Sequence, residues 1–427
     1  MNKALRVWWA ENSVGVLRID EHGDLEFTYD TGWVGDSTKR AISVSLPKRD
    51  EPFGRRKTRP FFAGVLPDEG QRDLVARVLG VSERNDFRLL ERLGGDVAGA
   101  LTLWQDGEAP PVLEPLSASE PLSEDALIKV LETLPKRPLL AGDEGIRLSL
   151  AGAQQKLPVV LVDGQVALPI PGQPSTHILK PPSRDLPSST ENEALSLRLA
   201  RAIGLDAASV ETRRTGDHAY LLVERYDRVI DAKGVIRRLH QEDFCQALGI
   251  PPERKYASDG GPNFKPCFGL VREAVTQPAP ALLRLIDAAI FNVAIGNADA
   301  HGKNFSLLYR DQSTDFAPLY DLLCTAAYPD VHAKLAMKIG KRSTLEEFNT
   351  ETWTTFADDV GVAPPYVRRR AGALARMILD RIDGVGRQLA DEGFDTQDLH
   401  RFIDVIRSRA ELLLDLPAPR PLAAADI

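Results

Sequence analysis

Cysteine is scarce in this 427-residue sequence, and its scarcity excludes several kinds of site. The three cysteines, Cys245, Cys267 and Cys324, are far apart and form no C-x-x-C pair. A zinc site or a thiol redox motif is therefore not expected. A disulfide framework is not expected either, which is typical of proteins in a reducing cytoplasm.

Long apolar runs and an excess of positive charge are also missing. No run approaches the roughly 18–20 apolar residues of a membrane span, and the N-terminus lacks the apolar core of a signal peptide. The formal net charge of -8 argues against a surface that binds nucleic acid throughout. We therefore expect a cytoplasmic protein without membrane contact. Its 43% hydrophobic residues are enough for a large core spread over two or three domains.

Strand patterns dominate the first half of the chain, and helix patterns dominate the second half. Short strand-like segments fill residues 1–46, whereas residues 47–60 are basic and predicted to be a loop. Residues 106–145 are rich in Pro, Glu and Ser and are interpreted as a connector. Strands return after Arg147, and helices follow from about Leu239 onward. This order predicts an α+β fold with two lobes. The predicted domains are residues 1–105, 106–236 and 237–427.

The segment FNVAIGNADAHGKNFSLLY (291–309) places a dense polar cluster between two core-like runs. Polar side chains are costly to bury there unless something pairs with them. Asp299 and Asn304 are spaced D-x-x-x-x-N, as in a kinase catalytic loop, where Asp accepts the proton of the attacking hydroxyl and Asn holds magnesium. A turn rich in Asn and Asp between helix and strand is the plain structural alternative.

A further acidic residue strengthens the kinase interpretation. FSLLY and FAPLY are predicted to form a short hairpin that returns Asp321 beside the catalytic loop. Asp321 would then occupy the position of a second magnesium ligand. The alternative is that Asp321 caps a helix DLLCTAA, and both interpretations can hold together.

The N-terminal half contains the other parts of a nucleotide site. Lys180 ends the strand HILK, as does the lysine that contacts ATP phosphates in kinases, and an acidic helix follows. Glu193 is the preferred partner of this lysine, and Glu191 stays open. An ordinary strand-end lysine and favourable first-turn acids are the structural alternatives.

Two loops complete this set. SLAGAQQK lies between two strands, where a phosphate-covering loop belongs, but its single glycine, Gly152, makes a weak phosphate motif. LLVERYDR joins the β-rich half to the helical half, where an adenine-binding hinge would lie. Glu224 and Tyr226 could present backbone groups to the base, or the segment could be a simple linker.

In this order the motifs resemble the HipA family of serine/threonine kinases, the toxins of bacterial HipBA-type toxin–antitoxin pairs. The resemblance runs from the N-terminal region past residue 340. It rests on the segments FFAGVLPDEG (61–70), LSLAGAQQK (148–156), HILKPP (177–182), ENEALSLRLARAIGL (191–205), LLVERYDR (221–228), LHQEDFCQALG (239–249), KYASDGGPNF (255–264), NADAHGKNFSLLY (297–309) and LYDLL (319–323).

The resemblance implies a protein-kinase-like fold with an extra N-terminal subdomain (1–105), a nucleotide-binding lobe (106–236) and an all-helical catalytic lobe (237–427). It also implies ATP and Mg²⁺ as cofactors. The residue roles that it carries over are Asp299 and His301 as catalytic residues, Asn304 and Asp321 as metal ligands, Ala151, Gly152, Ala153, Gln154, Lys180, Glu224, Tyr226, Gln241 and Tyr320 as ATP-binding residues, and Glu193 as the partner of the lysine.

Ser149 matches the loop serine that members of this family phosphorylate on themselves. In the family this modification accompanies ejection of the phosphate loop and loss of activity. A phosphate adds about -1.5 to -2 charges and three strong acceptors, so it would repel ATP phosphates in the same loop. The sequence by itself would favour an ordinary strand-end serine at this position.

The resemblance also implies partners: a helix-turn-helix antitoxin of the HipB type, operator DNA bound through that antitoxin, and a protein substrate such as an aminoacyl-tRNA synthetase. Two basic stretches, residues 55–59 and 368–376, could contact DNA phosphates. Ordinary solvated faces explain them better, because acids are interspersed and the net charge is negative.

Two other functions remain open from the sequence. A small-molecule phosphotransferase also uses a D-x-x-x-x-N loop, and a non-catalytic corepressor would need only the DNA-binding partner. The N-terminal subdomain and Ser149 favour the protein kinase over the first alternative. The intact set of Lys180, Asp299, Asn304 and Asp321 argues against the second.

Overall fold

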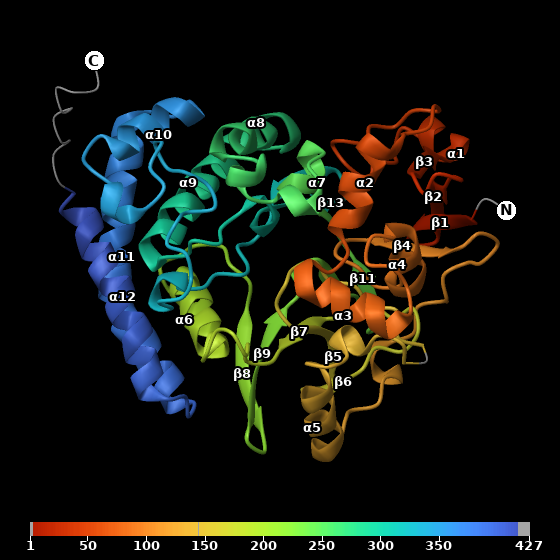
Figure 1. The fold of residues 1–427 in the computed structure, drawn as a ribbon, viewed down its shortest axis with the longest axis horizontal. Coiled ribbons are helices and arrows are strands. Elements are labelled where there is room, and N and C mark those ends of the chain that lie inside the picture. The colour runs from red at the N-terminus through yellow and green to blue at the C-terminus, as the bar shows by residue number, and fades with distance from the viewer. Residues whose placement is uncertain (1–2, 144, 417–427) are drawn as a thin grey trace. The chain divides into compact units, whose positions relative to one another are not determined.

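Figure 1 shows the computed structural model, which describes residues 3–143 and 145–416. The chain forms two compact units. The first comprises Met1–Thr190, Ala208–Lys255 and Phe305–Ala317, and the second comprises Glu191–Ala207, Tyr256–Asn304 and Pro318–Ile427. All the named strands lie in the first unit, and the longest helices lie in the second. The predicted β-rich N-terminal half and helical C-terminal region are therefore confirmed.

An antiparallel sheet with the order β3-β2-β1-β4 forms the N-terminal part of the first unit. Its strands are β1 (Lys3–Trp9), β2 (Asn12–Ile19), β3 (Leu25–Tyr29) and β4 (Leu101–Gln105). In β3, Leu25, Phe27 and Tyr29 are buried while the residues between them are less so, as expected of a strand with one face on a core. Phe61 and Phe62 pack into the same core.

Four helices accompany this sheet: α1 (Thr31–Gly35), α2 (Arg55–Gly64), α3 (Glu69–Leu79) and α4 (Asp86–Leu93). The prediction of a loop over residues 47–60 is wrong for its second half, where α2 begins at Arg55. Local sequence hides this helix, because it opens with exposed basic residues and contains Pro60. Burial of Phe61 and Phe62 stabilises it, by about 1.5–3 kcal/mol for each side chain.

A five-stranded sheet with the order β6-β5-β7-β9-β8 follows in the first unit. Its strands are β5 (Leu157–Val162), β6 (Gln165–Ala167), β7 (His177–Lys180), β8 (Val210–Thr215) and β9 (His218–Glu224), with α5 (Glu124–Thr133) beside it. Leu157, Val159, Leu179 and Leu222 join Leu131 of α5 in one buried cluster. The strand that ends at Lys180 is therefore central in its sheet and fixed on both edges.

Two small β elements complete the first unit. They are the hairpin of β10 (Arg228–Ile230) and β11 (Ile236–Arg238), and the sheet of β12 (His240–Asp243), β13 (Ser306–Arg310) and β14 (Ser313–Phe316), with α7 (Phe244–Leu248) after β12. The predicted hairpin before Asp321 is confirmed, although its second strand ends where FAPLY begins. Residues 237–427 thus contain strands as well as helices.

The second unit is built from the helices α6 (Ser189–Ala202), α8 (Phe264–Ala274), α9 (Pro278–Ile295), α10 (Thr352–Val360), α11 (Pro364–Asp391) and α12 (Thr396–Leu414). The first two residues of α6 belong to the first unit. Figure 1 shows α11 and α12 lying side by side, in blue. The predicted apolar positions Leu195 and Leu199 of α6, and Ile203 just after its end, are all buried.

One helix corrects the expectation that no run is long enough for a membrane. Within the described residues α9 is apolar enough over 18 residues to cross one, by length and composition alone. Most of this helix is buried, and it packs against α8, α11 and α12. We therefore interpret α9 as the core helix of the second unit.

Candidate active site

The polar cluster of residues 297–304 follows directly on the C-terminal end of α9. Gly296 ends this helix in the left-handed conformation (φ 74°), and a Cβ atom there would lie 2.7 Å from Ala326 Cβ. Asn297 then fixes the turn. Its Nδ2 donates to Asn292 Oδ1 (2.8 Å), and its Oδ1 accepts from the Asp299 N–H (3.1 Å). Two buried amides therefore position the backbone that carries the exposed Asp299 carboxylate.

A tyrosine that sequence patterns do not single out contacts both predicted catalytic residues. The Tyr256 hydroxyl donates to Asp299 Oδ1 at 2.8 Å. Its ring packs edge-on against His301, with 5.2 Å between the ring centroids. Asp299 and His301 are thus brought together around one ring. An oriented, exposed carboxylate can accept a proton from a substrate hydroxyl.

Asn304 and Asp321, the predicted metal ligands, are also adjacent. Asn304 Nδ2 donates to Asp321 Oδ2 at 3.3 Å. Asn304 is only 6% exposed, and its Oδ1 is buried without a hydrogen-bond donor among the described residues. A buried acceptor without a donor is costly, by about 1–3 kcal/mol. Binding of a hard cation would satisfy it, and amide and carboxylate oxygens are the ligands that Mg²⁺ prefers. The residues present therefore fit magnesium.

The rest of such a site would come from outside the protein. Residues 3–143 and 145–416 contain no group of three or more His, Cys, Asp or Glu side chains suited to a metal. Mg²⁺ commonly takes one or two protein ligands and completes its octahedron with phosphate oxygens and water. A site of one carboxylate and one amide is consistent with a cation that arrives with a nucleotide.

The helix-cap interpretation of Asp321 is wrong. No helix starts at this residue, and the next helical turn begins at Thr325. Asp321 instead has a positive φ of 57°. Such a backbone is strained for a residue other than glycine, and strain of this kind clusters at functional sites.

Tyr320 anchors the same region from the neighbouring position. Its hydroxyl donates to the Lys303 carbonyl at 2.7 Å. Lys303 itself is buried within the predicted catalytic loop. The sequence shows Lys303 in the polar cluster, but its spacing alone suggests no role for it.

In the first unit, the predicted phosphate loop is held by residues 65–68. The Asp68 N–H donates to the Gly152 carbonyl at 3.3 Å. Gly152 has a φ of 108°, and a Cβ atom there would lie 2.5 Å from Lys156 Nζ. Lys156 Nζ donates to the Ala151 carbonyl at 2.7 Å. Glycine at 152 thus permits both the backbone turn and the close approach of a cation, which the single-glycine motif does not reveal.

Ser149 lies at the start of this loop and is completely buried. Its N–H donates to the Asp96 carbonyl (2.9 Å), and its Oγ donates to the Val65 carbonyl (2.8 Å). The Ser149 N–H and hydroxyl thus both donate to backbone carbonyls. The hydroxyl could accept a phosphate only after its hydrogen bond to Val65 has broken and the loop has exposed it.

Lys180 and the hinge residues lie on adjacent strands of the five-stranded sheet. Lys180 is 5% exposed at the end of β7 and pairs in register with Leu221 of β9. Glu224 ends β9 and is exposed, and its N–H donates to the Ser209 carbonyl at 2.9 Å. That N–H is therefore engaged within the protein.

Tyr226 and Gln241 are brought together by the structure. The Tyr226 hydroxyl donates to Gln241 Oε1, and Gln241 Nε2 donates to Asp227 Oδ2 at 3.2 Å. Burial, with the nearby charge of Asp227, raises the pKa of Tyr226 well above its ordinary value, so its hydroxyl stays a donor. These two hydrogen bonds link the predicted hinge to β12.

A buried ionic network lies behind the hinge. Asp96 accepts from Arg228 Nη2 (2.9 Å), Arg238 Nε (3.1 Å) and Ser175 Oγ (2.7 Å). Burial alone would raise the pKa of Asp96, but the charges of Arg228, Arg225 and Arg238 lower this pKa far below its ordinary value. Asp96 thus stays charged. Its backbone carbonyl also holds Ser149, so one residue joins the phosphate loop to the network.

Asp227 is the second carboxylate of this network. It accepts from Arg225 Nη2 at 2.9 Å and from the Gly99 N–H at 2.8 Å. Although burial alone would raise it, Arg225 and Arg228 lower the pKa of Asp227 to about 2. Arg225 and Asp227 flank Tyr226 in sequence, so the network fixes the backbone on both sides of the predicted hinge residue.

The remaining predicted residues divide between the two units. Ala153 and Gln154 lie in the first unit with Ser149 and Lys180. Glu193 lies in the second unit, on α6, and is 1% exposed, whereas Glu191 is partly exposed. The pairing of Lys180 with Glu193 stays a prediction.

The basic stretches support the interpretation as solvated faces. Arg55 forms an ion pair with Asp24 at 2.9 Å. Arg370 donates to both carboxylate oxygens of Asp287, at 2.6 and 2.8 Å. These arginines are engaged in local ion pairs within their own units.

Comparison with known proteins identifies the class first. A chain of the solved complex of HipA, HipB and operator DNA from Shewanella oneidensis superposes with a TM-score of 0.83, at 27% identity over 96% of this chain and 98% of that one. The fold is therefore the kinase-like fold of HipA, as predicted. The HipA N-terminal domain model matches residues 5–104, and the HipA-like C-terminal domain model matches residues 148–382.

The chain belongs to the HipA family. It is 54% identical, over 96% of its own length and 98% of the relative's, to the Sinorhizobium fredii protein named "Putative kinase Y4mE". It is 30% identical to the "Serine/threonine-protein kinase toxin HipA" of Shewanella oneidensis, over 74% of this chain and 75% of that protein. Its relatives are thus named as kinases, and one of them as a toxin.

Proposed function

We propose that this protein is an ATP-dependent serine/threonine protein kinase and the toxin of a type II toxin–antitoxin pair in the cytoplasm. The observation that carries the proposal is the buried Asn304 Oδ1, which has no hydrogen-bond donor among the described residues. Asn304 contacts Asp321, and it follows the exposed Asp299 by five residues in the sequence. This is the arrangement that phosphoryl transfer needs: a base next to a cation site. The names of the relatives support the same class of reaction.

In this proposal Asp299 is the general base. Its carboxylate accepts the proton of a serine or threonine hydroxyl, whose oxygen forms the new bond to the γ-phosphorus of ATP. The bond to the bridging oxygen breaks, and ADP leaves. Tyr256 holds the carboxylate through its 2.8 Å hydrogen bond, and His301 supports Tyr256 from the side.

Other residues of this chain bind the nucleotide. Residues 151–154 would cover its phosphates and Lys180 would contact them, with Glu193 as the partner of the lysine. Glu224, Tyr226, Gln241 and Tyr320 would line the adenine and phosphate positions. Asn304 and Asp321 would hold Mg²⁺, which when bound neutralises charge on the phosphates.

Ser149 is the proposed site of autophosphorylation. A phosphate on its Oγ would face the Val65 carbonyl, an acceptor with no proton to donate, inside a fully buried position. Like-charged and acceptor-rich contacts of this kind are disruptive. The modified loop would therefore leave its position on residues 65–68, and the Gly152 contact with Asp68 would be lost.

The proposed partners are a helix-turn-helix antitoxin of the HipB type and, through it, operator DNA. The support is the similar chain from Shewanella oneidensis, which was solved with HipB and its operator. The protein substrate is proposed to be a cytoplasmic protein such as an aminoacyl-tRNA synthetase.

Calorimetry with a non-hydrolysable ATP analogue, with and without Mg²⁺, tests the site. We expect Mg²⁺ to tighten binding to the wild type, and Asn304→Ala and Asp321→Ala to remove this gain while leaving metal-free binding intact. Asp217→Ala, an exposed carboxylate in the turn between β8 and β9, is the matched control. An unchanged Mg²⁺ effect in both site variants would contradict the assignment.

The alternatives give different results in companion assays. Phosphate transfer to a metabolite but to no protein would indicate a small-molecule phosphotransferase. Absence of ATP binding together with intact operator repression would indicate a non-catalytic corepressor.

A further inference from the structure

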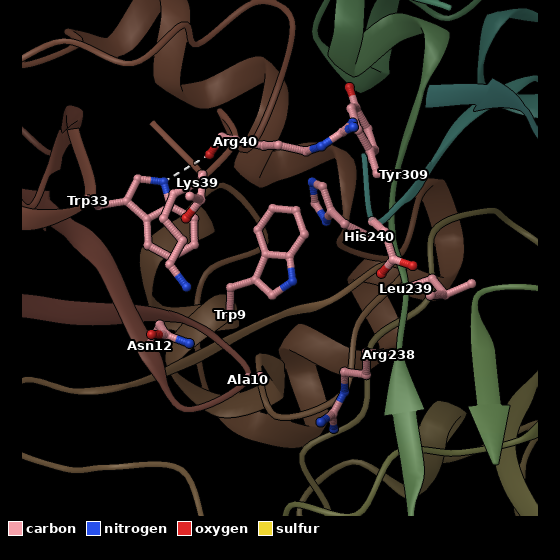
Figure 2. A pocket seen from close by; sticks show the side chains of 12 residues that line it. Trp9, Ala10, Asn12, Trp33, Lys39, Arg40, Arg238, Leu239, His240 and Tyr309 are labelled. Atoms are coloured by element: carbon pink, nitrogen blue, oxygen red, sulfur yellow. Dashed lines mark hydrogen bonds between the residues drawn. The ribbon is translucent and has the colours of Figure 1, made fainter. Parts of the chain in front are cut away.

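A pocket of about 290 Å³ opens in the first unit, and its lining includes none of the residues assigned above to nucleotide binding and transfer. Its walls come from the turn after β1, from residues 33–40, from the start of β12 and from the turn after β13. Figure 2 shows Trp9 in the middle of these side chains, with Trp33 and Lys39 on one side and His240 and Tyr309 on the other.

Four aromatic rings, those of Trp9, Trp33, His240 and Tyr309, line the pocket. The rings of Trp9 and His240 are 4.5 Å apart, those of Trp9 and Trp33 are 6.0 Å apart, and those of His240 and Tyr309 stack at 5.3 Å. Trp9 is only partly buried, so part of its face remains open to the pocket. Such a surface suits a flat ring system, because aromatic pairs are stabilised beyond their buried area.

His240 contributes a ring and no charge. Its Nε2 lies 2.7 Å from the Ile42 carbonyl, which can only accept, so this nitrogen carries the proton. Burial lowers the pKa of His240 to about 4, which keeps the ring neutral at physiological pH. The charge of the pocket must therefore come from other residues.

Cations outnumber acids in the wall. Lys39, Arg40 and Arg238 line the pocket, against Asp311 as the one acid among the lining residues. Arg238 is engaged in an ion pair with Asp96, which also pairs with Arg225 and Arg228. Within the part of the chain that the structure describes, no carboxylate lies within ion-pair distance of Lys39 or Arg40.

Arg40 lines the pocket and is positioned to bind an anion. Its Nη1 donates to Thr314 Oγ1 at 2.9 Å, and the guanidinium lies 5.8 Å from the centre of the Tyr309 ring. Lys39 lies 5.3 Å from the centre of the Trp33 ring. Neither cation forms an ion pair, although Asp36 lies near enough to Lys39 to interact with its charge, so Arg40 is the less compensated of the two cations beside the aromatic rings.

We propose that this pocket binds a small aromatic anion: one ring system, packed against Trp9, that carries one phosphate or carboxylate group, held by Arg40 and Lys39. The volume is close to the lower end, about 300 Å³, of small-molecule sites. It suits a mononucleotide or an aromatic carboxylate and is too small for a dinucleotide. His240 directly precedes Gln241 in β12, so an occupant would touch the strand that contacts the predicted hinge.

Titration of the full-length protein with defined probes tests this site. The probes are GMP and indole-3-acetate, with guanosine (ring without charge) and ribose 5-phosphate (charge without ring) as comparisons. Trp9 and Trp33 report binding by tryptophan fluorescence, and calorimetry gives the stoichiometry. We expect saturable one-to-one binding of GMP or of indole-3-acetate, which distinguishes the phosphate from the carboxylate source, and at least about tenfold weaker binding of both comparisons.

Variants localise the binding. Arg40→Gln and Trp9→Leu should each weaken it by about tenfold, whereas Arg310→Gln, an exposed arginine at the end of β13 outside the wall, should not. Lys39→Gln provides a second charge variant if Arg40→Gln unfolds, as judged by circular dichroism. Absence of saturable binding of both probes, or binding that is equal in the wild type and all pocket variants, would overturn the proposal. Binding of GMP that the pocket variants leave unchanged would place it at another site.

Discussion

Replacement of Asp96 by asparagine is expected to destabilise the first unit strongly. The substitution keeps the shape of the side chain but removes its charge. Asp96 is 2% exposed and lies in contact with Arg225, Arg228 and Arg238. After the change, three buried guanidinium groups would share only Asp227.

The size of the effect follows from the burial of these charges. Removing one partner of a buried ion pair typically costs about 3–5 kcal/mol, because the remaining charge stays desolvated. Asparagine retains one acceptor oxygen for Ser175, so we expect a loss of about 3 kcal/mol in the free energy of unfolding. That is a large share of the 5–15 kcal/mol typical of a domain.

The loss should also reach the predicted phosphate loop, because the Asp96 carbonyl accepts a hydrogen bond from the Ser149 N–H. We expect faster hydrogen exchange over residues 148–156 in Asp96→Asn than in the wild type. Urea unfolding measures the stability, and Asp217→Asn, exposed in the same unit, is the matched control, with an expected change within about 0.5 kcal/mol. A loss below about 1 kcal/mol with unchanged exchange over the loop would refute the reasoning.

Three further changes test other contacts. Burial raises the pKa of Glu242 to about 7. Between about pH 4.5 and 7 the folded state therefore holds a proton that the unfolded state has released, so the free energy of unfolding should fall by up to about 3 kcal/mol as pH rises through this range. Glu242→Gln should remove this pH-dependent contribution. The neutral His240 changes the pH dependence in the opposite direction, so the free energy of unfolding of wild type and Glu242→Gln is compared by urea unfolding at each pH. An equal dependence on pH in both proteins would contradict the raised pKa of Glu242. Gly152→Ala should weaken ATP binding by about tenfold, because alanine is strained at a φ of 108°; unchanged affinity in calorimetry would show that the loop relaxes. Tyr256→Phe should lower kcat about three- to tenfold without altering the KM for ATP, because it removes one hydrogen bond to Asp299, and an unchanged kcat would mean that Tyr256 does not position the base.

Local patterns in the sequence were sufficient for several elements. The spacing of Leu195, Leu199 and Ile203 was enough to predict helix α6, although nearly all of its residues are buried rather than one face. Continuous apolarity was enough to predict α9. The polar loop after α9 is visible because its residues interrupt two core segments. The hairpin of β13 and β14 could be predicted from the apolar run FSLLY and the turn residues after it, but its second strand, Ser313–Phe316, lies before the apolar run FAPLY and not within it.

Contacts between distant residues could not be predicted in the same way. Tyr256 and Asp299 are 43 residues apart, and Asp96 and Arg228 are 132 apart. No periodicity marks such pairs, since each depends on the packing of whole elements. Helix α2 escaped prediction for a related reason: the contacts of Phe61 and Phe62, rather than local propensity, stabilise it.

The proposed metal ligands show both cases at once. The spacing of Asp299 and Asn304 suggested a catalytic loop from the sequence alone. The neighbouring Asp321 was compatible with a helix cap until the structure showed a positive φ and an adjacent Asn304 amide. Geometry at one residue therefore excludes the helix cap, and the role of Asp321 as a metal ligand stays a prediction.

Intact-mass spectrometry after incubation with ATP and Mg²⁺ tests the central claim, that Asp299 supports phosphoryl transfer, most directly. Wild type, Ser149→Ala and Asp299→Asn would first be treated with phosphatase, which is then removed, and their masses would be compared after incubation with ATP and Mg²⁺. Calorimetry would confirm that each protein binds ATP. The account predicts the gain of one phosphate on the wild type alone, with ATP binding retained by Asp299→Asn. Full phosphorylation of Asp299→Asn, or no gain on an unmodified wild type that binds ATP, would contradict it.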